Sequence, residues 1–298
     1  MRVYYSDPYE LPLPPGHRFP AGKYRMLRQR LLACGLVREA ELALAPMADW
    51  DVLARAHSPT YLAAVRFGGL SQAQQRQIGF PWSPELVRRS RASVGGTLQA
   101  VRTALEAGIA GNLAGGTHHA FADRGAGFCV FNDLAVSALE ALAQGWVRRV
   151  AVLDLDVHQG DGTAALLRGR PGLWTASVHA QANYPFRKVP SDLDVGLPDG
   201  TEDAPYLEVV QAVLRKLERF RPDLVLYQAG VDSLREDRLG RLALSLEGLA
   251  KRDELVLSWA RRLKVPIALT LGGGYAEPME RTVEAHLQTY RIARELFG

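Results

Sequence analysis

The sequence predicts an α/β fold in which a parallel sheet is covered by helices on both faces. Short apolar runs rich in β-branched residues, each ending in glycine or polar residues, are typical of strands buried on both faces. Longer stretches between them repeat apolar residues every three or four positions, as amphipathic helices do. Strands that alternate with helices favour a parallel sheet. With 298 residues, 47% of them hydrophobic, we expect residues 1–298 to form a single domain.

The expected elements follow from these patterns in chain order. We predict strands at residues 2–5, 111–114 (the weakest), 150–153, 173–178, 224–227 and 267–271. We predict helices at residues 84–107, 133–144, 204–220, 246–263 and 278–297. Pro205 and Pro278 fall where a first helical turn tolerates proline. Residues 66–82 carry glycine, glutamine and proline with little periodicity, which predicts a surface loop.

Composition excludes several classes of protein. No apolar run is long enough to span a membrane, and the first residues lack the apolar stretch of a signal peptide. The only two cysteines, Cys34 and Cys129, fit a reducing compartment better than a disulfide scaffold. We therefore expect a cytoplasmic protein without a membrane partner, whose oligomeric state the sequence does not indicate.

The net charge of +4 raises the question of nucleic acid. The short basic clusters, such as Arg148-Arg149 and Arg261-Arg262, are scattered through predicted helices instead of forming one stripe. This distribution favours solvated helix faces over a nucleic-acid surface.

Chemically active residues follow the predicted strands directly. In parallel α/β sheets, ligands bind at the carboxyl ends of the strands, so these residues are expected to meet at one edge. The segments that follow the strands are Gly115-Gly116-Thr117-His118-His119, Asp154-Leu155-Asp156-Val157-His158, His179, Gln228-Ala229-Gly230-Val231-Asp232 and Gly272-Gly273-Gly274-Tyr275.

The segment from Asp154 to His158 is the centre of this edge. If strand geometry persists, Asp154, Asp156 and His158 project to the same side. Oxygen and nitrogen donors of this kind suit zinc. Alternatively, the acids cap the following turn and His158 is simply buried. Asp232 at another strand end favours the metal site.

The histidine pair and the tyrosine have two interpretations each. His118 and His119 follow two glycines and can serve as general base, general acid or metal ligands, although such pairs are often incidental surface residues. Tyr275 follows three glycines and is suited to donate to a developing oxyanion, or it is only packed beside a flexible turn. His57, His179 and His286 are expected to be packing or surface residues, whereas the role of His17 stays open.

These segments together resemble the histone deacetylase family, whose superfamily includes acetylpolyamine amidohydrolases and acetoin-utilisation proteins. The resemblance runs from about His17 to beyond Tyr275. It implies the arginase/deacetylase fold, with a single eight-stranded, mostly parallel sheet between helices. His158-Gln159 and residues 191–200 look most like class IV and bacterial members. The motifs are those named above together with Gly127-Phe128-Cys129, Asn132-Asp133 and Asp161-Gly162.

The resemblance also implies roles for individual residues. Asp156, His158 and Asp232 would ligate Zn²⁺, and Fe²⁺ is an alternative occupant of the same ligand set. His119 would act as general base and then general acid, with His118 assisting electrostatically. Tyr275 would donate to the oxyanion. The remaining implied residues are Asp154 and Asp161, hydrogen-bonded to the two histidines; Gly127, Phe128, Leu239 and Gly273, along the substrate tunnel; and Asp154, Asp156, His158, Ser177 and Val178, around a structural K⁺.

Three departures from better-known relatives bear on the substrate. Residues 79–82 have no counterpart of the aspartate that clamps the substrate backbone in several eukaryotic members. Lys23 stands where many relatives have an arginine in an internal channel. The chain also has little room for the long loop of acetylpolyamine-specific enzymes.

The function expected from these features is hydrolysis of an acyl-amide. The substrate would be an Nε-acetyl- or longer acyl-lysine peptide, or a small acylated amine. The alternatives are an acetylpolyamine or other small-molecule amidohydrolase, a ureohydrolase with two manganese ions, and a non-catalytic relative that binds acyl ligands.

Overall fold

A single parallel sheet forms the centre of the protein, which the computed structural model describes over residues 1–298. The eight strands lie in the order β2-β1-β3-β8-β7-β4-β5-β6, and every neighbouring pair is parallel. The predicted α/β class and eight-stranded sheet are thus confirmed, with no antiparallel strand. The strands are β1 (Arg2–Tyr5), β2 (Leu42–Leu44), β3 (Ile109–Asn112), β4 (Val150–Asp154), β5 (Leu173–Ala180), β6 (Leu193–Leu197), β7 (Leu224–Gln228) and β8 (Ile267–Thr270).

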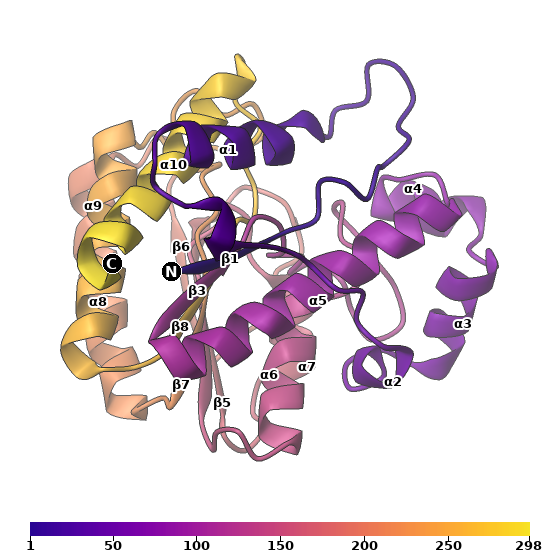
Figure 1. Ribbon diagram of the computed structural model, residues 1–298, viewed down its shortest axis with the longest axis horizontal. Coiled ribbons are helices and arrows are strands. Elements are labelled where there is room, and N and C mark those ends of the chain that lie inside the picture. The colour runs from indigo at the N-terminus through magenta and orange to yellow at the C-terminus, as the bar shows by residue number, and fades with distance from the viewer.

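Helices cover both faces of the sheet (Figure 1). Helices α1, α8, α9 and α10 pack on one face, and α5, α6 and α7 on the other. None of the helices is both long and apolar enough to cross a membrane. Their bounds are α1 (Gly22–Ala33), α2 (Trp50–Leu53), α3 (Pro59–Phe67), α4 (Gln72–Ile78), α5 (Pro84–Ala107), α6 (Asp133–Ala143), α7 (Asp161–Leu167), α8 (Asp203–Phe220), α9 (Leu246–Leu263) and α10 (Met279–Phe297), with a short 3₁₀ helix at Glu39–Glu41.

The central strand β4 shows why its sequence is apolar throughout. Ala151 and Leu153 join the core under α8, α9 and α10, whereas Val150 and Val152 join the core under α5 and α6. Alternate side chains of a strand point to opposite faces, so a strand covered on both sides needs an apolar residue at every position. Each fully buried valine or leucine contributes about 1.5–3 kcal/mol.

Helix ends agree with the sequence where capping signals are strong. The side chain of Ser83 accepts a hydrogen bond from Leu86 N, Pro84 occupies the first turn, and α5 ends before Gly108. Ser245 caps α9 in the same way, through Gly248 N. The predicted bounds of both helices are confirmed.

The prediction of a surface loop at residues 66–82 is wrong. Helix α3 ends only at Phe67, and α4 occupies Gln72–Ile78. Ser71 and Gln74 form a reciprocal capping box, and Gly79 ends the helix in the left-handed conformation. The sequence of α4 is mostly polar, so hydrophobic periodicity did not reveal it.

The elements that were not predicted are mostly short or peripheral. The edge strands β2 and β6 have only three and five residues, and α1, α2, α3 and α7 also lay outside the predicted set. Strand β3 begins two residues before the predicted strand, at Ile109. None of these differences moves the segments that follow β3, β4, β7 and β8, which meet at the carboxyl edge of the sheet.

Candidate functional site

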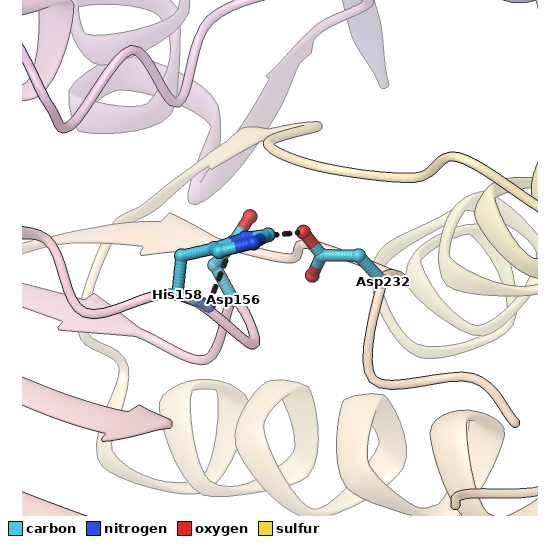
Figure 2. A group of neighbouring side chains, drawn as sticks. All are labelled: Asp156, His158 and Asp232. Carbon is cyan, nitrogen blue, oxygen red and sulfur yellow. Dashed lines mark hydrogen bonds and ion pairs between the residues drawn. The ribbon is translucent and has the colours of Figure 1, made fainter. Parts of the chain in front are cut away.

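Three buried side chains converge at the middle of this edge. Asp156 and His158 follow β4, and Asp232 follows β7, the strand beside it. One ligand atom from each residue lies within 4.8 Å of the others. Nδ1 of His158 lies 3.1 Å from Oδ1 of Asp156 and 3.0 Å from Oδ2 of Asp232, and Figure 2 shows Asp232 facing the other two from its separate segment.

The convergence has a different local cause from the one expected. Strand β4 ends at Asp154, so strand geometry does not persist to His158. Instead, Oδ1 of Asp154 accepts a hydrogen bond from Asp156 N at 3.1 Å, and Oδ1 of Asp156 accepts one from His158 N at 3.0 Å. Side-chain-to-backbone bonds two residues apart are the turns that aspartate favours. The acids therefore do hold a turn, as the alternative interpretation had it, and that turn presents His158 to the carboxylates.

The electrostatics of the three residues favour a cation between them. Burial raises the pKa of Asp232 to about 7, and the neighbouring Asp156 carboxylate adds to this rise. Burial disfavours protonated His158, but its hydrogen bonds to Asp156 and Asp232 outweigh burial and raise its pKa to about 10. Two buried carboxylates facing one imidazole nitrogen fit a divalent metal, and the O, N and O donors match a catalytic zinc site with three protein ligands.

Two histidines stand beside this cluster, each held by a carboxylate. Nδ1 of His118 lies 2.7 Å from Oδ2 of Asp154, and Nδ1 of His119 lies 2.7 Å from Oδ1 of Asp161. The ionised carboxylates can only accept hydrogen bonds, so each Nδ1 carries a proton. Nε2 of each ring does not take part in these two hydrogen bonds. The four residues are buried, and such outer partners fix the orientation of an imidazole ring.

The two histidines differ in charge. Burial, followed by the charge of His118, lowers the pKa of His119 to about 4. Burial also disfavours charged His118, but the Asp154 and Asp156 carboxylates outweigh it and raise the pKa of His118 to about 9. Near neutral pH, His119 can therefore accept a proton at Nε2, whereas His118 contributes positive charge.

The glycine run before Tyr275 packs directly on the metal-ligand candidates. Gly273 N donates to Oδ2 of Asp156 at 2.7 Å, and a Cβ at Gly273 would overlap the Asp232 carboxylate. Tyr275 N donates to Oδ2 of Asp237 at 2.6 Å. Burial raises the pKa of Tyr275 well above its ordinary value, so the phenol stays protonated and can donate.

A cavity of about 620 Å³ leads to these residues. All four residues expected along the tunnel line it: Gly127, Phe128, Leu239 and Gly273. Phe128 has a φ of 64°, a conformation that bulky residues rarely adopt, and its N–H donates to Ile78 O at 2.7 Å. This backbone directs the ring toward Phe19 and Phe80, whose centroids lie 5.3 and 5.4 Å away.

Sequence reasoning missed two contributors to the site. The ring of Tyr184 lies 4.9 Å from that of His119 and lines the same cavity. It belongs to no motif that could have revealed it. Asp237, which holds the backbone of Tyr275, lies in a loop between β7 and α9 without a recognisable pattern. Its burial beside the site is visible only in three dimensions.

Lys23 lies deep beside the glycine run. Its side chain is buried, and Nζ lies 3.3 Å from the carbonyl oxygens of Gly272 and Gly274. The ammonium also lies 5.3 Å from the centroid of the Tyr275 ring. Lys23 thus supports the backbone that carries Tyr275 and does not line the cavity.

The other histidines lie outside the reactive group. His17 contacts Gly79 O through Nε2 at 2.9 Å and stacks on Phe80. His57, His179 and His286 are expected to be packing or surface residues, and the structure confirms packing, since all three are buried and none lines the cavity.

The residues expected around K⁺ also lie together. Asp154 and Ser177 are register partners on β4 and β5, and Val178 follows Ser177 in the same strand. The carbonyl oxygens of Asp156 and His158 accept no hydrogen bond from the backbone. Carbonyl groups without donors, beside a carboxylate and a hydroxyl, are suitable ligands for a hard cation.

Comparisons with known proteins point to one family. A family profile described as "Histone deacetylase domain" matches residues 17–290. The chain is 43% identical to an uncharacterized protein of Picosynechococcus, over 99% of this chain and 98% of that protein. It is 30% identical to histone deacetylase 2 of Arabidopsis thaliana, over 94% of this chain and 76% of the relative.

A solved structure resembles the whole chain. A crystal structure described as an HDAC homolog complexed with SAHA superimposes with a TM-score of 0.83 and 26% identity. The match covers 100% of this chain and 84% of the other.

Proposed function

Because the chain belongs to the histone deacetylase family, we propose that it hydrolyses an acylated lysine side chain with the help of zinc held by Asp156, His158 and Asp232. The observation that carries this proposal is the arrangement around one cavity: a buried three-ligand cluster, two histidine–aspartate pairs and a buried tyrosine. Fe²⁺ could occupy the same ligands. We propose that residues 1–298 act as one catalytic domain.

Zinc at this site would polarise the amide carbonyl and lower the pKa of a water molecule. His119, neutral and held by Asp161, would take the proton from that water at Nε2 and return it to the leaving lysine nitrogen. His118 supplies positive charge beside it. Tyr275 donates its hydroxyl proton in a hydrogen bond to the oxyanion that develops at the carbonyl.

The walls of the cavity suit a straight apolar chain. The ring of Tyr184 lies 4.9 Å from that of His119, and a Cβ on Gly127 would touch both rings. The ring of Phe128 lines the same cavity, 6.1 Å from the ring of Tyr275. The methylene groups of a lysine side chain can pass between such aromatic walls and leave bulk water behind. Further apolar residues line the cavity, among them Leu11, Ile78, Leu86, Val130 and Phe131. This lining supports acyl groups longer than acetyl as additional substrates.

A structural potassium ion is part of the proposal. The side chains of Asp154 and Ser177 and the carbonyl groups of Asp156, His158 and Val178 would hold it. Asp154 also binds His118, so such an ion would stabilise the carboxylate that orients this histidine.

Other functions fit less well. A ureohydrolase with two manganese ions needs further carboxylate ligands beside the cluster, but the nearby Asp154 and Asp161 are hydrogen-bonded to His118 and His119. A small acylated amine, including an acetylpolyamine, could enter the cavity. A non-catalytic acyl-binding protein would not need the two histidine–aspartate pairs or Tyr275.

The proposal can be tested with protein freed of metal by a chelator and reloaded with Zn²⁺, Fe²⁺ or Mn²⁺. We expect the zinc and iron forms, but not the metal-free form, to release acid from acyl-lysine peptides. A series from acetyl to long-chain acyl groups identifies the preferred length. Absence of hydrolysis across the series, in protein shown to contain one metal per chain, would refute the proposal. A content of two manganese ions per chain would instead favour the ureohydrolase.

Replacing Tyr275 by phenylalanine is expected to lower kcat about 10²- to 10³-fold, because one oxyanion donor is lost. The substitution removes only the hydroxyl, so metal content and the melting temperature should stay unchanged. Tyr9→Phe is a matched control, since its hydroxyl binds Ala45 O away from the cavity. Steady-state kinetics on the best acyl-lysine peptide gives the comparison. Equal kcat in the Tyr275 variant would remove this residue from the mechanism.

A further inference from the structure

The mouth of the cavity is lined by exposed arginines. Arg18 lies before α1, Arg76 on α4, and Arg238 and Arg241 in the segment between β7 and α9. All four are exposed, and they are called the mouth arginines below. Three separate segments of the chain thus bring positive charge to one opening.

No acidic residue balances this charge within the lining. The only carboxylates among the lining residues are Asp156 and Asp232, which are buried in the proposed metal site. Arg18 and Arg76 form no ion pair. Arg238 pairs with Glu277 at 2.9 Å and Arg241 with Asp199 at 3.1 Å, both exposed pairs, which water and salt weaken.

The segment that carries Arg241 is held in place. Asn183 Oδ1 accepts a hydrogen bond from Arg241 N at 2.9 Å, and Asn183 Nδ2 donates to Leu239 O at 2.6 Å. Asn183 is buried, and its neighbour Tyr184 forms a wall of the cavity. The backbone around Arg241 is therefore tied to the segment that forms this wall of the cavity.

We propose that the mouth arginines select acyl-lysine peptides in which acidic residues flank the modified lysine. This inference rests on the proposed function and names its substrate class. An acylated lysine is neutral at its amide, so the charge of the substrate comes from its flanking residues. Carboxylates at those positions meet the four arginines as the acyl-lysine enters, and complementary charge accelerates association.

The same charge acts against cationic substrates and products. An acylated polyamine keeps ammonium groups that the mouth arginines repel, as they repel a peptide rich in lysine and arginine. Hydrolysis converts the neutral acyl-lysine into a lysine ammonium. Repulsion by the mouth then favours release of the product.

The test uses one acyl-lysine peptide with glutamate, glutamine or lysine on both sides of the modified residue. With the zinc-loaded protein, we expect kcat/KM to fall in the order glutamate, glutamine, lysine. The ratio of the glutamate to the glutamine peptide should be about tenfold at low ionic strength, since each exposed pair contributes up to about fivefold. Raising the salt concentration should reduce the ratio.

The variant Arg18→Glu/Arg76→Glu should bring this ratio to about one or below. Arg168→Glu/Arg170→Glu is the matched control, because both arginines are exposed, unpaired and placed between α7 and β5, at the opposite edge of the sheet. It changes the net charge equally and should leave the ratio as it is. A loss of the ratio in both variants would mean that overall charge, not the mouth, sets the preference, and would overturn the inference.

Binding of the three peptides, followed by fluorescence anisotropy, separates this inference from the proposed function. Preference for the glutamate peptide supports the mouth as a selector even if turnover is slow. Equal dissociation constants and equal kcat/KM for the three peptides would overturn the inference and leave deacylation intact. Failure to hydrolyse any peptide that binds would instead count against the proposed function.

Discussion

Replacing Asp232 by asparagine is expected to abolish metal binding and hydrolysis together. The carboxylate is fully buried, with one oxygen accepting from Val157 N and the other facing His158. The amide keeps the size of the side chain but removes the charge that a cation requires. Because a metal supplies several kcal/mol to such reactions and 1.36 kcal/mol is tenfold in rate, we expect kcat to fall about 10⁴-fold or more.

Elemental analysis of purified protein, together with peptide kinetics, measures both effects. Asp192→Asn is the control, since this aspartate accepts hydrogen bonds from the backbone and hydroxyl of Thr175, away from the cavity. It should keep its metal and its activity. Full metal occupancy in the Asp232 variant would show that Asp232 is not a metal ligand.

Replacing His119 by alanine is expected to lower kcat about 10³- to 10⁴-fold, at the upper end of what general acid–base catalysis contributes. His119 is proposed to move the proton in both halves of the reaction, so no other group replaces it. It does not belong to the three-ligand cluster, and metal content should therefore stay near one per chain.

Asp161→Asn provides a graded comparison. This change keeps the imidazole of His119 but removes the carboxylate at 2.7 Å that orients it. Losses of outer partners amount to about 10–100-fold, so the Asp161 variant should lie between wild type and the His119 variant. If His119→Ala retained most of its kcat, proton transfer would have to be assigned to another group.

Much of the fold was predictable because the central strands are apolar at every position. Strand β4 alternates between two cores, and a run without polar residues is the direct result. Capping residues at Ser83 and Ser245 marked the helix starts. The edge strand β2 has three residues and lies at the border of the sheet, so it carries too little pattern to be recognised. Helix α4 was not predicted for a related reason, since its mostly polar sequence shows no apolar periodicity.

The residues of the candidate site were predictable because parallel strands end at one edge. The order of β4 and β7 in the sheet was not predictable, and it is their adjacency that brings Asp232 to His158. The turn through Asp154 and Asp156 was not predictable either. It depends on side-chain-to-backbone hydrogen bonds, which the alternation of side chains along a strand does not describe. Tyr184 and the mouth arginines come from segments that are distant in sequence, so only the folded chain relates them to the cavity.

The adjacency of β4 and β7 has a consequence for how the chain folds. His158 and Asp232 are 74 positions apart, and the two strands join the β2-β1-β3-β8-β7 part of the sheet to the β4-β5-β6 part. Asp156, His158 and Asp232 cannot meet before this seam has closed, so a metal held by all three would bind only the finished sheet. A ligand that binds the native state alone shifts the folding equilibrium toward it. A metal ion at this site would thus also stabilise the junction of the two parts of the sheet. We expect metal-free protein to unfold first between β4 and β7.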